Sequence, residues 1–111
     1  MKTRTVVAYE HYFEEFLKEL PLKVQNKIYK VIEAVGTLER IPSNYLKHLQ
    51  DGLYETRIQL GSNIWRVLCF FDGYKVVVLL TGFQKKTQKT PSSEIKRGIK
   101  LMNKYYTENE N

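Results

Sequence analysis

The stretch from Leu53 to Phe71 constrains the fold most, because it has the alternating pattern of a β-hairpin. Between residues 53 and 60, side chains of two kinds alternate, which is the period of a strand with two different faces. A turn follows at Gly61, and residues 64–71 predict the returning strand. One arginine lies in each strand, so the position of these two charges is fixed once the pairing of the strands is known.

The register of this hairpin decides whether Arg57 and Arg66 lie on the same face. Opposed residues in an antiparallel pair have numbers with a constant sum, and the sum for these two arginines is odd. A loop of two or four residues gives an odd sum, whereas a loop of three residues would separate them. We adopt the odd sum because it gathers the apolar side chains on one face: Tyr54, Thr56, Ile58, Leu60, Trp65, Val67, Cys69 and Phe71.

A second hairpin is predicted at the Asp-Gly pair of residues 72–73, where glycine suits the positive φ of a two-residue type I′ turn. Tyr74 would then lie opposite Phe71. The arginine face would be basic at one end and apolar at the other, so a helix or a partner protein must cover the apolar end. Alternation assigns Val76, Val78 and Leu80 to the apolar face, and Lys75, Val77, Leu79, Thr81 and Phe83 to the arginine face.

The flanking segments predict one more strand and three helices. Thr3–Tyr9 is rich in β-branched residues, whereas residues 10–20 and 22–37 have apolar side chains at helical spacing and are separated by Pro21. Residues 39–51 predict an ordered loop. Thr90 and Pro91 suit the N-cap and first turn of a last helix that extends to about Tyr106. The expected element order is β-α-α-β-β-β-α, in a single α+β domain over residues 1–111.

Composition limits the classes of protein that remain. The chain of 111 residues is long enough for one core, and 42% of it is hydrophobic. The single cysteine, Cys69, excludes a disulfide framework and a cysteine-based zinc site, and no segment has membrane-spanning length. We therefore expect a cytoplasmic protein. The net charge of +6, with three lysines in residues 84–89, favours a polyanionic or acidic partner.

Four segments carry a family resemblance: Gly52–Arg57, Trp65–Val67, Leu80–Pro91 and Glu94–Ile95. Together they resemble the HigB-like, phage-derived toxins of the RelE/ParE superfamily. The resemblance implies a RelE-like fold, in which a small twisted antiparallel sheet carries an N-terminal helical hairpin on one face and a C-terminal helix. It also implies the toxin of a type II toxin–antitoxin module, which cleaves mRNA on the ribosome without a metal or other cofactor. The expected partner is a cognate antitoxin with a helix-turn-helix fold.

Matched position by position, the resemblance places catalytic roles on Arg57, Arg66, Lys85 and Lys86. Several relatives have a catalytic or base-stacking tyrosine or histidine near the C-terminus. This chain departs from that pattern, because only Tyr105 and Tyr106 are available there, deep in the last predicted helix.

Cleavage without a metal requires the ribose 2′-hydroxyl to attack the adjacent phosphorus and expel the 5′-oxygen. Arginines on rigid strands suit the stabilisation of the added negative charge. We expect Arg66 to be a surface residue of its strand. His48 is the better placed of the two histidines as acid or base; a lysine with a lowered pKa, or ribosomal RNA, is the alternative. Candidates for RNA contact are Phe83, Gln84 and Lys89.

Each assignment has a structural alternative. Arg57 can pair with Glu55 or Glu94, the lysines can belong to a solvated turn, and Phe83 can be a core residue. Two other functions also fit the pattern: a ParE-like toxin that inhibits DNA gyrase by binding, and a nucleic-acid-binding module without catalysis.

Overall fold

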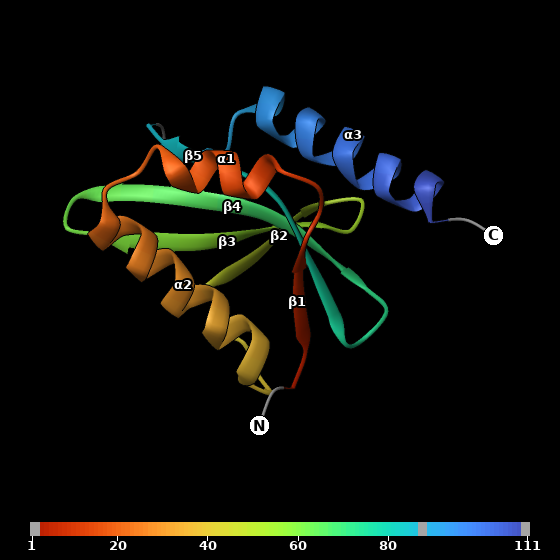
Figure 1. The fold of residues 1–111 in the computed structure, drawn as a ribbon, viewed down its shortest axis with the longest axis horizontal. Coiled ribbons are helices and arrows are strands. Elements are labelled where there is room, and N and C mark those ends of the chain that lie inside the picture. Colours follow the sequence, from red (N-terminus) through yellow and green to blue (C-terminus); the bar gives the residue numbers. More distant parts are fainter. Residues whose placement is uncertain (1–2, 87–88, 110–111) are drawn as a thin grey trace.

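The computed structural model describes residues 3–86 and 89–109, and it shows one sheet with helices on both faces (Figure 1). The five strands lie in the order β1-β5-β4-β3-β2. Helices α1 and α2 pack on one face and α3 packs on the other. The elements are β1 (Thr5–Ala8), α1 (Tyr12–Lys18), α2 (Leu22–Thr37), β2 (Leu46–Gln50), β3 (Leu53–Leu60), β4 (Asn63–Asp72), β5 (Val76–Lys85) and α3 (Ser92–Glu108).

The predicted α+β class and helical hairpin are confirmed, but the sheet differs from the expectation in two ways. It is mixed rather than antiparallel, because β1 pairs with β5 in parallel. Residues 46–50 form strand β2, although a loop was predicted over residues 39–51; this strand pairs with β3 in an antiparallel manner. Neither feature is visible in local periodicity, because both depend on pairing with a strand that is distant in the sequence. Strand β2 is also short and forms by pairing with β3.

The predicted register of the first hairpin is confirmed. Leu60 lies opposite Asn63, so the loop is the two-residue turn of Gly61 and Ser62, and Arg57 lies directly opposite Arg66. The apolar side chains gather on the face covered by α1 and α2, as expected for this register. This core contains Ile58, Trp65, Val67 and Cys69 from the hairpin, and Phe13, Leu17, Val24, Ile28, Val31, Ile32 and Val35 from the two helices.

The predicted second turn is wrong. Asp72 lies opposite Val76, so three residues form the loop, and Tyr74 is 96% exposed rather than opposite Phe71. A three-residue loop changes the parity of the pairing, which moves Val77 and Leu79 to the α1 and α2 face and Val76, Val78 and Leu80 to the α3 face. A bulge between Val67 and Cys69 then restores the predicted parity, and Phe83 lies opposite Arg66.

Helix α3 covers the apolar end of the arginine face, which the sequence predicted must be covered. Its buried Leu101 and Met102 pack with Leu53, Leu68 and Phe70 of the sheet. Near the C-terminal end of α3, the Tyr105 hydroxyl donates a hydrogen bond of 2.6 Å to Asp72, and Tyr9 donates to Glu108. These contacts fix the C-terminal half of α3 against the apolar end of this face.

The start of α3 differs from its prediction. Pro91 occupies the N-cap position, and no side chain caps the first turn. The Thr90 hydroxyl, which was expected to cap the helix, instead donates a hydrogen bond to Glu55. Among the described residues, no helix is long and apolar enough to cross a membrane.

Candidate functional site

Arg57 and Arg66 face each other across the β3–β4 ladder and lie on the same side of the sheet as Phe83. Opposed side chains in an antiparallel pair have Cβ atoms only about 5 Å apart. Guanidiniums carried on such opposed positions repel each other unless an anion lies between them, so the arrangement needs a compensating charge.

Glu55 supplies that charge. Its side chain is 1% exposed, and its Oε2 lies 3.2 Å from Nε of Arg66 and 3.7 Å from Nε of Arg57. Its other oxygen accepts the hydrogen bond from Thr90. A carboxylate that is deprived of water is stable only when paired and hydrogen-bonded in this way. Glu55 therefore holds both arginines in place and ties the strand to the segment that follows the basic loop.

The expectation that Arg66 lies on the surface is wrong. Arg66 is only 4% exposed, whereas the side chain of Arg57 is 33% exposed. Burial lowers the pKa of Arg66, and the charge of Arg57 lowers it further, while Glu55 acts in the opposite direction. An arginine remains protonated under these conditions, so the site contains one fixed, buried cation and one that solvent can reach.

Of the two predicted lysines, Lys85 joins this cluster. Lys85 is the last residue of β5, lies opposite Ile64 and is half-buried. Burial lowers its pKa, and the charges of Arg66, Arg57 and Lys47 lower it further. Lys86 follows the strand and is exposed.

His48 lies on the wrong face to act with the arginines. It pairs with Tyr54 and stacks edge-on against that ring, with the ring centroids 5.0 Å apart. Tyr54 packs against the core beneath α1 and α2. Because β2 is a strand and not a loop, its side chains alternate, and Lys47, opposite Glu55, takes the place on the arginine face that was expected for His48.

The residues predicted to contact RNA are divided between the two faces. Phe83 is half-buried on the arginine face, where it packs against the α3 core. Gln84 lies opposite Trp65 on the other face, and its amide is 3.5 Å from Asn63. Lys89 is exposed. Thr87 and Gln88 of the predicted basic loop lie outside the described residues.

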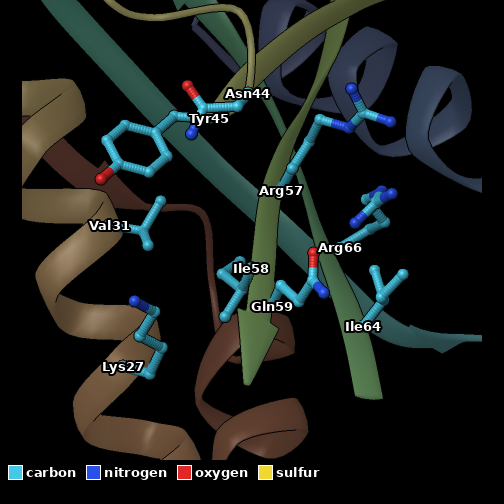
Figure 2. Close-up of a pocket in the computed structure, with 9 residues that line it drawn as sticks. All are labelled: Lys27, Val31, Asn44, Tyr45, Arg57, Ile58, Gln59, Ile64 and Arg66. Carbon is cyan, nitrogen blue, oxygen red and sulfur yellow. The ribbon is translucent and has the colours of Figure 1, made fainter. Parts of the chain in front are cut away.

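A hollow of about 410 Å³ opens beside the two arginines (Figure 2). Figure 2 shows Arg57 and Arg66 on one side of β3 and α2 on the other, so the hollow passes round the edge of this strand. The edge is free beyond Arg57, because the pairing of β2 with β3 ends at Thr56 and the N–H of Arg57 bonds the carbonyl of Tyr45. Polar and apolar side chains from both layers line it: Lys27, Val31, Asn44, Tyr45, Arg57, Ile58, Gln59, Ile64 and Arg66.

Three residues of this region were missed as site residues by sequence reasoning: Glu55, Lys47 and Lys27. Glu55 was considered only as a surface partner of Arg57, although its place two residues before an arginine in one strand puts both on the same face. Placing Lys47 on the arginine face would have required the prediction of strand β2. Lys27 lies on the basic side of α2, and only the tertiary structure shows that it reaches the hollow.

The thiol of Cys69 and possible metal ligands are further candidate reactive groups among the described residues. Cys69 is fully buried, and burial raises the pKa of its thiol to about 11, so it stays protonated at neutral pH. Within residues 3–86 and 89–109, no three His, Cys, Asp or Glu side chains are grouped so that they could hold a metal ion.

Comparison with known proteins agrees with this fold. Residues 15–103 match the family of phage-derived Gp49-like proteins. Among solved structures, the chain is similar to one in the archaeal RelE–RelB complex from Pyrococcus horikoshii OT3, with a TM-score of 0.53 and 18% identity. The match covers 74% of this chain and 94% of that chain. A search of curated protein sequences finds no significant match. The family match spans most of the chain, which therefore belongs to the phage-derived Gp49-like family, a RelE-type family of toxins.

Proposed function

We propose that this protein is the toxin of a type II toxin–antitoxin module and acts as a ribosome-dependent, metal-independent endoribonuclease on mRNA. The observation that carries the proposal is the opposed pair Arg57 and Arg66, held by the buried carboxylate of Glu55 with Lys47 and Lys85 beside it. A rigid cluster of cations of this kind suits a phosphate that gains negative charge in the transition state.

In the proposed reaction, the 2′-hydroxyl of one ribose attacks the adjacent phosphorus, and the bond from phosphorus to the 5′-oxygen of the next nucleotide breaks. The 5′-oxygen leaves and takes up a proton from water, so that the products are a 2′,3′-cyclic phosphate and a free 5′-hydroxyl. Arg57 and Arg66 hold the phosphoryl oxygens, which carry the added charge of the transition state. Lys85 is our candidate for accepting the proton of the 2′-hydroxyl, because it lies at the end of β5 on the arginine face, and burial and the neighbouring cations lower its pKa relative to a free lysine.

A cognate antitoxin is the proposed partner, and we expect it to be a helix-turn-helix protein encoded beside this chain. Support comes from the structural neighbour, which was solved as a complex of RelE with RelB. An antitoxin that binds over the basic face would neutralise the protein by occupying the surface needed for mRNA.

Arg57→Ala is the sharpest test, because this side chain is accessible and its removal leaves the ion pair of Glu55 with Arg66 intact. Loss of one group that stabilises a developing oxyanion lowers the rate by about a hundredfold or more. Primer extension on ribosome-bound mRNA should show cuts within codons for the wild type and far fewer for the variant. Arg40→Ala, an exposed loop position, is the control.

Two results would contradict the proposal. One is growth arrest by the wild type with intact mRNA and collapsed DNA supercoiling, which is the result expected of a gyrase inhibitor. The other is an Arg57→Ala protein that folds and cleaves at the rate of the wild type.

A further inference from the structure

We infer that the hollow at the free edge of β3 is a second binding site, which holds one nucleotide of single-stranded RNA next to the phosphate held by the arginines. The inference rests on the proposed function and extends it to a part of the surface, the α2 side of the sheet, that no family motif marks. Its central residue is Lys27.

The charges around the hollow fit a polyanion. Three of its lining residues are cations, Lys27, Arg57 and Arg66, and no carboxylate lines it among the described residues. Lys27 is half-buried, yet within the described part of the chain it forms no hydrogen bond or ion pair. A lysine that is partly removed from water without a counter-ion is a site where an external phosphate gains a contact at little cost in reorganisation.

The shape of the hollow fits a single-stranded RNA chain that continues past the two arginines. It extends from Arg57 and Arg66 on one side of β3 to Lys27 on α2 on the other side (Figure 2). Its volume of about 410 Å³ lies within the usual range for small-molecule sites, about 300–1,000 Å³. An RNA chain whose scissile phosphate lies at the arginines can therefore turn round the edge of β3 and place its neighbouring nucleotide in the hollow.

Groups that can hydrogen-bond to a base or sugar are also present. The direction of the backbone is shown by the N–H of Arg57, which points away from β4 and is already bonded to the carbonyl of Tyr45 at 2.8 Å. Because backbone groups of every second residue in a strand point in the same direction, the N–H and C=O of Gln59 also point to this free edge. The side-chain amides of Asn44 and Gln59 line the same space, and the Tyr45 ring forms one wall. Single-stranded RNA is recognised through such edge contacts to unpaired bases.

The test compares Lys27→Gln with Lys23→Gln, which removes the same charge one helical turn earlier at a position that does not line the hollow. The probes are fluorescein-labelled 2′-O-methyl oligonucleotides of two and six nucleotides, which lack the attacking hydroxyl. Fluorescence anisotropy at several salt concentrations gives Kd and its dependence on salt. Thermal unfolding confirms that each variant is folded.

We expect Lys27→Gln to weaken binding of the six-nucleotide probe several-fold, and to reduce the slope of log K against log salt by about 0.7, the value for one phosphate contact in a single strand. Binding of the two-nucleotide probe should be unaffected by this change but weakened by Arg57→Ala. The Lys23→Gln protein should bind both probes as the wild type does.

The two proposals fail in different ways. If Lys27→Gln and Lys23→Gln bind the longer probe equally well, the hollow is not a nucleotide site, and the arginine cluster is unaffected by that result. If Arg57→Ala leaves binding of the short probe unchanged, the arginines do not hold phosphate. A wild-type protein that binds neither probe overturns the second site.

Discussion

Glu55 and Arg66 form a buried ion pair in which Oε2 and Nε are 3.2 Å apart, at the point where the β3–β4 ladder also places Arg57. The carboxylate is nearly inaccessible to water and contacts both guanidiniums. It therefore reduces the repulsion between two cations that the hairpin register forces together, and it fixes the orientation of the planar group of Arg66. A phosphate that arrives at this face meets charges that are already in position, which is the condition for efficient transition-state stabilisation.

Replacing Glu55 by Gln keeps the shape of the side chain and leaves the buried cation of Arg66 without its counter-ion. Removing one member of a buried ion pair typically costs about 3–5 kcal/mol, and we expect the free energy of unfolding to fall by about 3 kcal/mol. Urea unfolding measures it, with the exposed Glu39→Gln as control. The double variant Glu55→Gln/Arg66→Gln should lose less than the sum of the single variants. Strict additivity would show that the two side chains are not coupled.

Thr90→Val tests the link between Glu55 and the segment after the basic loop. The change preserves the shape and removes one hydrogen bond, so we expect a loss of about 1 kcal/mol in the free energy of unfolding. Cleavage of ribosome-bound mRNA should fall several-fold because Glu55 and the end of the loop are no longer joined. Thr90→Ser, which retains the hydroxyl, should restore the rate. Equal cleavage by Thr90→Val and the wild type would leave the link with a structural role alone.

If Lys85 accepts the proton of the 2′-hydroxyl, cleavage should depend on pH. A base must be unprotonated to accept the proton of the 2′-hydroxyl, so the rate should rise with pH through the lowered pKa of this lysine. Lys85→Arg keeps the positive charge but cannot lose its proton, and the rise should disappear. Single-turnover cleavage on programmed ribosomes over a range of pH measures both profiles. If Lys85→Arg retains the profile of the wild type, another group accepts the proton.

Tyr105→Phe should reduce stability without reducing cleavage. Its hydroxyl donates to Asp72, six residues along β4 from Arg66, and six strand residues span about 20 Å. Loss of this hydrogen bond should lower the free energy of unfolding by about 1 kcal/mol. Chemical denaturation and primer extension measure the two quantities on the same preparation. A large fall in cleavage at unchanged stability would mean that the C-terminal tyrosine acts in the reaction after all.

The shared face of the two arginines could be predicted from the sequence. Side-chain alternation is a property of each strand, and a loop with an even number of residues gives the parity that puts Arg57 and Arg66 on one face. Their direct opposition required the two-residue turn that the structure shows. Helix α2 could also be predicted, because its apolar spacing gave its bounds of residues 22–37. The family resemblance also depends on short segments that are readable without a structure.

Other features were decided only in the tertiary structure, because they depend on what packs against a strand and not on the strand itself. The second turn has three residues, and a bulge between Val67 and Cys69 compensates for it; neither is encoded by the Asp-Gly pair alone. Burial of Arg66 depends on its contact with Glu55, whose second oxygen is bound by Thr90 from the segment before α3. Pairing of β2 with β3 turned His48 away and brought Lys47 to the arginine face, and the packing of α2 brought Lys27 to the free edge of β3. Alternation assigns a side chain to a face, but the charge, burial and neighbours that give it a function come from segments distant in the chain.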